Sequence, residues 1–494
     1  AFKPRAYRRA ADVILGLAEP IEDLVASRSH AELPGVGDAI AKKIAEIVET
    51  GHLKDHDELK AKLPIDLHGL TCVDGVGPKT AKLLYETLGV RTLDDLEKAA
   101  RAGKIRTVKG LGEKTEAKIL RGLEETRGVE GRMLLFAALR LAEDLVGELR
   151  QTGLFERVEH AGSVRRGRET IGDLDVLAVS ADPLSAVGAF LALPEVVEIL
   201  SRGETKASVR LGNGVQVDLR VVPAESFGAA LQYFTGSKAH NIELRKLAVA
   251  RGWKLNEYGL YDAADRPLAG KDETGIYRAL GLEFIPPEMR EAQGEMEAAS
   301  RGRAPRRFPK VVDLADLQGD FHVHTNASDG LASIADMVAA ARTRGLRFIA
   351  ITDHTRFAEV IGGLDAEGVA RQIDAIAKLN RTLRGFHVLT GVEVNVEPDG
   401  SLDLADEVLE RLDVVVAAVH SHFRLPRDEM TARLVRAVES EHVDILAHPT
   451  GRKIGERPSY DVDWDVVFAA ASKAGTALEI NANPYLGSDS SFLA

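Results

Sequence analysis

The sequence predicts a multidomain protein with an all-α N-terminal part, an α+β middle part and a C-terminal barrel of alternating strands and helices. Three observations lead to this fold class. At 494 residues the chain is too long for one hydrophobic core, so three or more compact units are expected. A Gly-x-Gly pattern opens a helical stretch three times before residue 128. After Gly319, short apolar strands alternate with helical segments, which indicates a parallel sheet or barrel.

The composition is typical of a soluble globular protein. Apolar residues make up 45% of the chain and charged residues 28%, and no run of about 20 apolar residues could span a membrane. Residues 1–11 are basic and amphipathic, so no signal peptide is expected, and a few residues are expected before Ala1 because it is not Met. Cys72 is the only cysteine, which excludes disulfides and thiolate metal sites within the chain. We expect a cytoplasmic monomer.

The net charge of −12 is unevenly distributed along the chain. Residues 1–128 carry 22 Lys and Arg against 21 Asp and Glu, whereas residues 319–494 carry 17 against 27. The excess of acids therefore lies in the C-terminal part, where carboxylates can serve as metal ligands. Because the N-terminal part is nearly neutral, any contact with DNA there must be local rather than through a broad basic field.

Three short repeats organise the N-terminal part. Each repeat precedes a helical stretch, over 38–47, 79–88 and 114–123, and the glycine pairs are Gly35 and Gly37, Gly75 and Gly77, and Gly110 and Gly112. Such glycines allow positive φ, and the amides at a helix N-terminus suit a phosphate. A single copy is more often a tight turn between packed helices, but three copies that open lysine-containing helices favour phosphate contact. This helix–hairpin–helix pattern binds the DNA backbone without reading the bases.

The middle part brings three acids together. It begins with a predicted helix over 133–151, and strands are predicted over 174–179 and 215–222. Asp173 and Asp175 are two residues apart and share a strand face, while Asp218 lies on the polar face of the second strand. Three carboxylates on adjacent strands suit two hard cations, Mg²⁺ or Mn²⁺, which can align a hydroxyl group and a triphosphate. The alternative is a solvated acidic strand edge.

A glycine–serine turn precedes these acids. Gly162 and Ser163 can approach a phosphate through backbone amides and a hydroxyl group, and Arg166 adds positive charge. The presence of this turn, together with the third acid, favours a catalytic site over the solvated edge.

A second cluster follows the acids. Tyr233 and Phe234 stand beside Gly236, where aromatic rings could pack against a nucleoside sugar. Asn241 and Arg245 lie four residues apart and therefore on one face of a helix. Taken alone, such polar residues are more often part of a solvated surface.

These motifs resemble family X DNA polymerases, in particular the bacterial and archaeal type, over practically the whole chain. The Tyr-Phe-Thr-Gly-Ser run from residue 233 and the Gly-Ser…Asp-x-Asp block carry the resemblance. It implies a template-directed DNA polymerase that fills gaps in DNA repair, with gapped or primer–template DNA and dNTPs as partners. It also implies that Asp173, Asp175 and Asp218 are the metal-binding catalytic acids, with Asp218 helping to deprotonate the primer 3′-hydroxyl.

The resemblance assigns further residues to nucleotide and DNA binding. It places Ser163, Arg166 and Gly172, beside Gly162, in the triphosphate pocket. Tyr233 and Phe234, next to Gly236, match the pair that excludes a ribose 2′-hydroxyl. Asn241 and Arg245 match minor-groove contacts to the nascent pair and the template. Lys238 departs from the acidic residue of the beta-type enzyme, which puts the nucleotide affinity in doubt.

The N-terminal helices resemble the 5′-phosphate-binding lyase domain of the same family. Lys43 falls where that domain has its Schiff-base lysine, and Lys3 matches a phosphate-binding lysine. Ala39 replaces another lysine of that pocket. A lysine on a helix is usually solvated, so lyase activity at Lys43 remains an open alternative.

Histidines follow the strands of the C-terminal part at regular intervals. Eight of the 14 histidines lie after residue 318. Ligand-type residues stand repeatedly at the carboxyl ends of apolar strands, the position of active sites in barrels. A lone histidine would be a core or surface residue, but this rhythm favours Zn²⁺ or Mn²⁺ ligands. The candidate ligands are His322, His324, Asp329, His354, Glu393, His420 and His448.

These motifs resemble the polymerase and histidinol phosphatase (PHP) domain of bacterial family X enzymes. The resemblance implies a distorted (β/α)₇ barrel, up to three metals, phosphoester hydrolysis and, in these polymerases, a 3′–5′ exonuclease. The family pattern ends in Asp-x-His after the strand that corresponds to residues 481–484, and no histidine follows His448 here. We therefore expect a weak or absent nuclease if the protein ends at Ala494, and an active one if the motif follows.

The domain boundaries expected from these patterns divide the chain into six segments. They are a lyase-like helix–hairpin–helix domain (1–63), a DNA-binding helix–hairpin–helix domain (64–131), a nucleotidyltransferase palm (132–224), a nucleotide-selection subdomain (225–288), a linker (289–318) and a PHP domain (319–494). Two other functions remain possible, a template-independent nucleotidyltransferase and a DNA-binding repair scaffold with an inactive nuclease. The first would not need three DNA-binding hairpins, and the second would be expected to have lost some of the acids.

Overall fold

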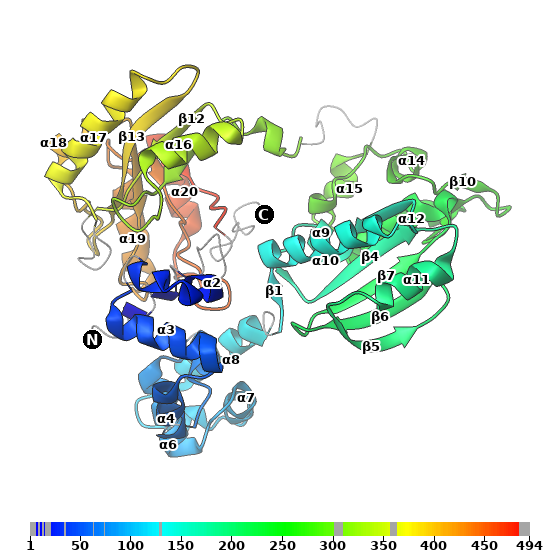
Figure 1. Cartoon of the computed structure of the whole chain (residues 1–494), viewed down its shortest axis with the longest axis horizontal. Coiled ribbons are helices and arrows are strands. Elements are labelled where there is room, and N and C mark those ends of the chain that lie inside the picture. The colour runs from blue at the N-terminus through cyan, green and yellow to red at the C-terminus, as the bar shows by residue number, and fades with distance from the viewer. Residues whose placement is uncertain are drawn as a thin grey trace. The chain divides into compact units, whose positions relative to one another are not determined.

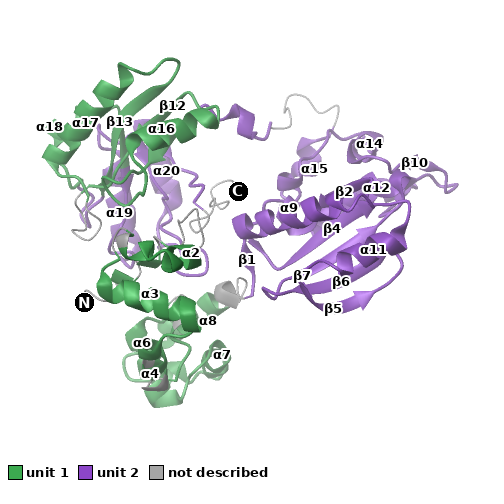
Figure 2. Cartoon of the chain, in the orientation of Figure 1, with its two compact units in different colours: residues 1–126, 320–395, 402–416 green, residues 127–319, 396–401, 417–494 purple. Residues whose placement is uncertain are grey.

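The computed structural model describes the chain except for residues 1–5, 8–9, 12–13, 15–20, 34–35, 63, 74, 128–130, 301–309, 356–362 and 484–494. It contains two compact units, where the chain length predicts three or more (Figure 2). The first unit comprises residues 1–126, 320–395 and 402–416, and the second comprises 127–319, 396–401 and 417–494. Each unit contains more than one hydrophobic core.

The N-terminal part is all-helical, as predicted (Figure 1). Its first helices pack around Val36, Ala41 and Ile44, and the following ones surround a separate core that includes Leu70 and Leu84. The helices are α2 (Ile21–Ala26), α3 (Asp38–Thr50), α4 (Lys54–Lys62), α5 (Leu67–Cys72), α6 (Pro78–Leu88), α7 (Leu93–Arg101) and α8 (Glu113–Arg127), with 3₁₀ turns at Ser29–Glu32 and Ile105–Thr107.

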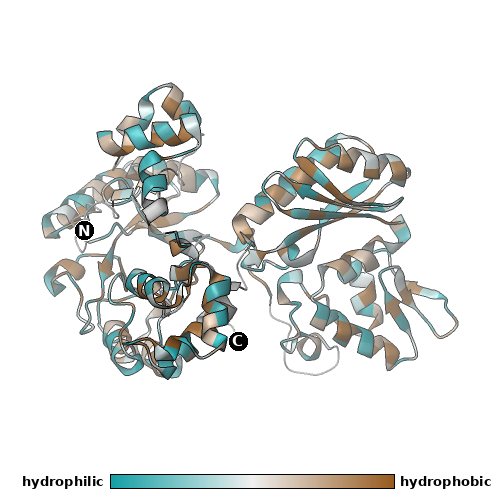
Figure 3. Cartoon of the chain, turned by 90° about the horizontal axis from the view of Figure 1, so that it is seen from below, coloured by the Kyte–Doolittle hydropathy of each residue, from teal (hydrophilic) through white to brown (hydrophobic). Residues whose placement is uncertain are grey.

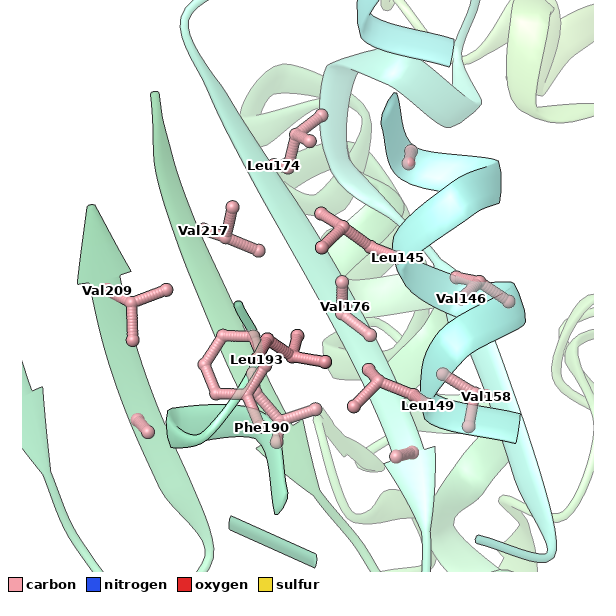
Figure 4. Packing of buried hydrophobic residues seen from close by; sticks show 14 of the residues in the cluster. Leu145, Val146, Leu149, Val158, Leu174, Val176, Phe190, Leu193, Val209 and Val217 are labelled. Atoms are coloured by element: carbon pink, nitrogen blue, oxygen red, sulfur yellow. The ribbon is translucent and has the colours of Figure 1, made fainter. Parts of the chain in front are cut away.

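A five-stranded sheet of order β2-β4-β7-β6-β5 forms the centre of the second unit. The apolar side chains of one face, such as Leu174 and Val217, pack against Leu145 and Leu149 of a long helix (Figure 4). Strands β4 and β7 are parallel, and the other neighbours are antiparallel. The elements are β1 (Met133–Leu134), α9 (Leu135–Gln151), β2 (Arg157–His160), α10 (Gly162–Arg165), β3 (Thr170–Ile171), β4 (Asp173–Val179), α11 (Pro183–Leu191), β5 (Val196–Arg202), β6 (Lys206–Leu211) and β7 (Gln216–Val221).

A smaller helical subdomain follows the sheet. Its core includes Leu244, Ile276 and Ala299. The elements are α12 (Phe227–Thr235), α13 (Lys238–Val249), β8 (Lys254–Asn256), β9 (Gly259–Tyr261), β10 (Pro267–Ala269), α14 (Glu273–Ala279) and α15 (Glu295–Ala298), with 3₁₀ turns at Ala224–Ser226 and Pro287–Met289.

The beginning of the expected linker over 289–318 belongs instead to this subdomain. Arg290 is 0% exposed and Glu295 is 4% exposed, and Ala299 is part of the core. Charged side chains are rarely buried unless they are paired, and both of these have partners within the subdomain. The polar composition of residues 289–300 was therefore misleading.

The C-terminal part alternates strands and helices, in a sheet of order β11-β12-β13-β14-β15-β16. The pairs β12–β13 and β15–β16 are parallel, as a βα barrel requires. Six strands of the expected seven lie among the described residues. The elements are β11 (Gly319–Val323), α16 (Ile334–Thr343), β12 (Phe348–Ile351), α17 (Ala366–Asn380), β13 (His387–Asn395), α18 (Asp406–Leu409), β14 (Val414–Ala418), α19 (Arg427–Val438), β15 (Ile445–Leu446), α20 (Trp464–Ala474) and β16 (Ala477–Leu478), after a 3₁₀ turn at Leu314–Asp316.

The helices carry both hydrophobic and hydrophilic residues (Figure 3), whereas strands β12 and β14 consist of apolar residues. Among the residues that the structure describes, no helix combines the length and the apolar character needed to cross a membrane.

Candidate active site and metal centre

Three carboxylates lie on neighbouring parallel strands of the central sheet. In the register of β4 and β7, Asp175 is opposite Asp218, and Asp173 is opposite Gln216. The intervening residues Leu174 and Val217 are both 0% exposed and belong to the core on the other face. Because side chains alternate along a strand, the three acids share the face away from that core, as the sequence predicts.

The electrostatics of these acids fit a cation site. Burial raises the pKa of Asp175 to about 7, and the negative charges of Asp173 and Asp218 add to the increase. Gln216 donates a hydrogen bond from Nε2 to Oδ2 of Asp218 at 3.1 Å and so orients that carboxylate. A group of carboxylate oxygens that repel one another is the donor set that Mg²⁺ or Mn²⁺ prefers.

The glycine–serine turn lies directly against the acids. Gly162, the first residue of the short helix α10, has φ +64°, and a Cβ added to it would lie 2.4 Å from Oδ2 of Asp175. The backbone N–H of Ala161 donates to the carbonyl of Asp175 at 2.8 Å. The turn therefore packs against Asp175, and Ser163 follows it in α10. Gly172 is close to a different group, because a Cβ there would lie 2.8 Å from Nη1 of Arg132.

Two arginines after this turn reach the helical subdomain. Arg165 forms a bidentate ion pair with Glu273, at 2.7 and 3.0 Å. Arg290, which is 0% exposed, donates to the same carboxylate at 2.6 Å. Arg166 donates from Nε to Oε1 of Glu291 at 2.8 Å, so the predicted triphosphate ligand holds an acid of the chain in this structure. Sequence reasoning missed Glu273 and Glu291, which carry no local signal.

The predicted nucleotide-selection residues lie around the end of α12 and the start of α13. The rings of Tyr233 and Phe234 meet edge to face with centroids 5.2 Å apart. The guanidinium of Arg220 lies over Phe234, and that of Arg245 lies 5.9 Å from the centroid of Tyr233. Asn241 donates to the carbonyl of Tyr233 at 2.7 Å.

Two of these residues differ in exposure. Asn241 is buried, and its amide oxygen accepts from Gln232, whereas Arg245 is exposed. Gly236 has φ +73°, and a Cβ there would lie 3.2 Å from Nη1 of Arg166, so a side chain would press on that arginine.

The three Gly-x-Gly repeats fold into the same hydrogen-bonded turn. In each, the residue between the glycines donates its N–H to the carbonyl three residues earlier at 2.9–3.0 Å: Val36 to Leu33, Val76 to Val73 and Leu111 to Val108. Gly75 and Gly110 adopt φ values of +88° and +91°. Gly37 and Gly77 stand immediately before α3 and α6, where the structure shows no side-chain cap on the first amides. Gly112 stands before α8 in the same way, and Gly35 lies outside the described residues.

The predicted lyase residues are only partly described. Lys43 on α3 forms a hydrogen-bonded ion pair with Asp55, which raises its pKa. Its ammonium also lies 5.9 Å from the centroid of the Tyr7 ring. A Schiff-base lysine must lose its proton to attack a carbonyl, and this ion pair opposes the loss. Lys3 lies outside the described residues.

Five of the seven predicted ligands of the C-terminal part gather in two overlapping groups. The first is His322, His324 and Glu393, and the second is His324, Asp329 and His354, and in each the ligand atoms all lie within 4.8 Å of one another. Glu393, which is 1% exposed, places Oε2 at 3.5 Å from His322 Nε2 and 3.4 Å from His324 Nε2. His324 Nδ1 lies 2.8 Å from Oδ1 of Asp329. A mixture of imidazole nitrogens and carboxylate oxygens suits Zn²⁺ or Mn²⁺.

The charges within these groups are paired. Burial would raise the pKa of Asp329, but hydrogen bonds from His324 and His354 outweigh it and hold that pKa well below its usual range. Burial lowers the pKa of His354, but the charge of Glu393 and the contact with Asp329 raise it to about 10. The donor atoms of a cation site are thus already gathered.

The two remaining predicted ligands belong to the second compact unit. His420 follows β14 and His448 follows β15, and their ring centroids are 5.5 Å apart. The backbone N–H of His448 donates to Oε2 of Glu479 at 2.7 Å. Both histidines therefore stand at strand ends, as predicted.

Four family models match the chain. They are a helix-hairpin-helix domain over residues 1–53, a SAM-like helix-hairpin-helix tandem over 68–125, a DNA polymerase beta thumb over 230–291 and a PHP domain over 320–483. The matches agree with the three kinds of predicted segment, all-helical at the N-terminus, polymerase-like in the middle and PHP at the C-terminus.

Curated proteins are similar to the chain over different lengths. The DNA polymerase/3′-5′ exonuclease PolX of Bacillus subtilis (strain 168) is 36% identical over 486 residues, which are 98% of this chain and 84% of that protein. DNA polymerase lambda of Rattus norvegicus is 29% identical over 322 residues, 59% of this chain and 52% of the relative. A probable phosphatase of Shewanella sediminis (strain HAW-EB3) is 34% identical over 168 residues, 33% of this chain and 63% of the relative.

Proposed function

The chain belongs to the family X DNA polymerases that carry a C-terminal PHP domain, and on this premise we propose that it extends a DNA primer by metal-dependent nucleotidyl transfer and trims 3′ ends in its PHP domain. The observation that carries the polymerase activity is the parallel register that sets Asp175 opposite Asp218, with Asp173 on the same face. Gap filling in DNA repair is the proposed context, with DNA and dNTPs as partners.

The residues of the palm have distinct roles in this proposal. Asp173, Asp175 and Asp218 hold the cations, and Asp218 accepts the proton of the primer 3′-hydroxyl. Two Mg²⁺ or Mn²⁺ ions bound there would supply charge for both the entering and the leaving oxygen. Gln216, which hydrogen-bonds to Asp218, keeps that carboxylate in place.

The neighbouring residues bind the nucleotide and DNA. Ser163, together with the amides of Gly162 and Gly172, contacts the triphosphate, and Arg166 joins it by exchanging Glu291 for a phosphate. The Tyr233–Phe234 pair, next to Gly236, excludes the ribose 2′-hydroxyl. Asn241 and Arg245 likewise exchange their contacts with Tyr233 for contacts with the minor groove of the DNA.

Primer extension on gapped DNA tests the polymerase assignment. Asp218→Ala should lower the extension rate by orders of magnitude, because it removes a ligand from the cation site. Asp144→Ala, an exposed acid on α9, is the matched control and should leave the rate unchanged. Equal rates for the two variants would contradict the assignment.

A template-independent nucleotidyltransferase is the second candidate for the palm. The three hairpin turns and the exposed Arg245 favour a templated reaction, since a template-independent enzyme does not need them. Supplying the four dNTPs one at a time separates the two. A templated enzyme incorporates mainly the complementary nucleotide, whereas comparable incorporation of all four would support the second candidate.

The PHP domain is proposed to cleave the 3′-terminal phosphodiester with Mn²⁺ or Zn²⁺ bound by its histidines and acids, His420 and His448 included. The two gathered ligand groups support this activity. The relative described as a probable phosphatase favours a second candidate, hydrolysis of a phosphomonoester. Digestion of 3′-labelled DNA, compared with release of phosphate from a 3′-phosphorylated end, distinguishes them. His322→Ala should abolish whichever of these two hydrolytic activities the PHP domain has, and Asp218→Ala should not.

The N-terminal lyase reaction stays a prediction. Borohydride trapping of Lys43 on DNA with a 5′-deoxyribose phosphate tests it, with Lys42→Ala as the control for Lys43→Ala. The ion pair with Asp55 leads us to expect weak trapping. A monomer and a cytoplasmic location likewise remain proposals.

A further inference from the structure

Asp353 is a buried carboxylate beside the histidine cluster that has no role among the proposed ligands. It follows β12 directly, immediately before His354, and is 0% exposed. Its Oδ1 accepts from the backbone N–H of Thr325 at 2.7 Å and from Oγ of Ser328 at 2.6 Å. Its Oδ2 accepts from Oγ1 of Thr325 at 2.7 Å and from Nε2 of Gln372 at 3.0 Å. The carboxylate therefore accepts four hydrogen bonds.

The donors belong to the segment that carries the second ligand group. Thr325 directly follows His324, and Ser328 directly precedes Asp329. Asp353 itself precedes His354, so one side chain joins the stretches that hold all three members of that group. The fourth donor, Gln372, lies on α17 and connects the carboxylate to the helical layer.

The loop between His324 and Gly330 is closely folded around these contacts. The backbone amides of Ser328 and Gly330 both donate to the carbonyl of Thr325, at 3.1 and 3.0 Å. A Cβ on Gly330 would lie 2.9 Å from the carbonyl oxygen of His324. Because the loop is this compact, its residues can shift only together. Losing the hydrogen bonds of Asp353 would therefore move the ligands on either side of the loop.

A carboxylate matches this set of donors. An ionised carboxylate accepts about four hydrogen bonds and donates none, whereas an amide turns an NH₂ group toward donors. Among the described residues, no cation pairs with Asp353, so its burial depends on neutral donors alone. A buried charge is costly unless it is fully hydrogen-bonded, so one held only by neutral donors indicates a positional requirement.

We propose that Asp353 is a positioning residue of the PHP metal centre, whose carboxylate fixes the 325–329 segment so that His324, Asp329 and His354 meet as one ligand group. Residues that orient metal ligands influence affinity strongly, because they set the geometry before the ion arrives. This inference rests on the proposed function only in taking that group as a metal site. The phosphoester that is cleaved does not enter the argument.

Metal titration of the full chain tests the proposal. In a background that carries Asp175→Ala and Asp218→Ala, calorimetry with Mn²⁺ reports the C-terminal sites alone. Asp353→Asn should lower the Mn²⁺ affinity there by about 10- to 100-fold. In the otherwise unmodified chain the same substitution should leave primer extension unchanged, which shows that the part of the chain around the three acids is intact. Unchanged Mn²⁺ affinity would overturn the proposal.

A compensating pair separates positioning from a general loss of structure. In Asp353→Asn, an amide nitrogen in place of Oδ2 meets the NH₂ of Gln372, but Gln372→Glu turns that donor into an acceptor. The hydroxyl of Thr325 can reverse its role, and the remaining oxygen keeps its two donors. The double variant should regain Mn²⁺ affinity to within several-fold of the background chain, whereas Gln372→Glu alone should not bind more tightly. Failure of the pair to recover any affinity would count against positioning.

A milder series covers the case in which Asp353→Asn unfolds the domain. Thr325→Val and Ser328→Ala each remove one hydroxyl donor and leave the carboxylate in place. Each should weaken Mn²⁺ binding several-fold, and Thr343→Val on α16, whose hydroxyl donates to the carbonyl of Ala339, should not. Equal affinities for all three would refute the proposal. If Mn²⁺ binding follows the prediction but no phosphoester is cleaved, the proposed activity fails while the positioning role stands.

Discussion

Gly162 provides the sharpest test of how the nucleotide-binding turn and the acids are fitted together. In Gly162→Ala, the new Cβ would lie 2.4 Å from Oδ2 of Asp175, at a backbone φ of +64°. Ordinary van der Waals contact begins at about 3.4 Å, so the carboxylate must retreat by about 1 Å or rotate away. Gly167, two residues beyond α10, has φ +66° but only Cγ of Glu288 near its added Cβ, at 3.9 Å. The two positions share the strained backbone and differ in the clash.

The expected magnitudes follow from this difference. A left-handed backbone costs a non-glycine residue about 1–2 kcal/mol, so both alanine variants should lose about that much unfolding free energy. A displacement of about 1 Å in a catalytic group can cost about 100-fold in rate, which corresponds to about 2.7 kcal/mol of barrier. Only Gly162→Ala displaces Asp175. We therefore expect a loss of about 100-fold in the rate constant for single-nucleotide extension, against less than about threefold for Gly167→Ala.

Single-turnover extension on gapped DNA, with saturating dNTP and Mg²⁺, measures the rate, and urea unfolding measures the stability. Similar stability losses with very different rates would support the fitted arrangement. Similar extension rates for the two variants would refute it, because the contact with Asp175 would then have no consequence. A rate restored in Gly162→Ala by high Mg²⁺ would indicate that the displaced carboxylate mainly weakens cation binding.

Two further predictions concern the palm contacts and the hairpins. Glu273→Gln should lower the free energy of unfolding by about 3–5 kcal/mol, because it leaves the buried Arg290 without its carboxylate. A urea midpoint equal to that of Glu283→Gln, a change at an exposed acid, would contradict it. Burial raises the pKa of Glu273, but Arg165 and Arg290 hold it below the usual range, so its stabilisation is present above about pH 4.5 and is lost as the pH falls. Binding of the full chain to DNA should weaken steeply between about 50 and about 200 mM salt and be nearly independent of sequence, because the hairpins contact phosphates. Gly75→Ala, at φ +88° and with Cγ1 of Ile119 at 3.2 Å, should reduce that affinity, and fluorescence anisotropy that shows no salt dependence would argue against backbone binding.

Local signals in the sequence predicted much of the palm site and of the helix boundaries. The helices expected to begin at residues 38, 79 and 114 begin at Asp38, Pro78 and Glu113. These starts could be predicted because a glycine that precedes a helix is a local signal in the sequence. The shared face of Asp173 and Asp175 follows from strand alternation alone. Asp218 was expected on the polar face of its strand, and the hydrogen bond that Gln216 donates to it is the consequence of their two-residue spacing. Features of this kind need no knowledge of distant contacts.

The contacts that join distant segments could not be predicted. Arg166 meets Glu291 across 125 residues, and His240 meets Glu295 across 55. A charged residue looks like a solvated one until its partner is known, so the segment around Arg290 was taken for a linker. The hydrogen bonds of Asp353 were hidden in the same way. Its neighbour His354 was predicted to be a ligand from the strand rhythm, but a buried carboxylate with four neutral donors leaves no pattern in the sequence.

The two candidate metal centres are charged in different ways, and this difference predicts how pH divides a limiting metal between them. In the palm, burial and the neighbouring acids raise the pKa of Asp175 to about 7, so a proton competes with the cation only below that pH. In the PHP domain, burial lowers the pKa of His354, but Glu393 and Asp329 raise it to about 10, so a proton competes there up to a much higher pH. Between pH 7 and pH 9 the palm affinity for Mn²⁺ should therefore level off while the PHP affinity continues to rise. With Mn²⁺ below the concentration of sites, the ratio of 3′-end removal to primer extension should increase over that range, and His354→Gln should abolish the increase. A ratio that stays constant in the unmodified chain would mean that the protons on these groups do not control access to the metal.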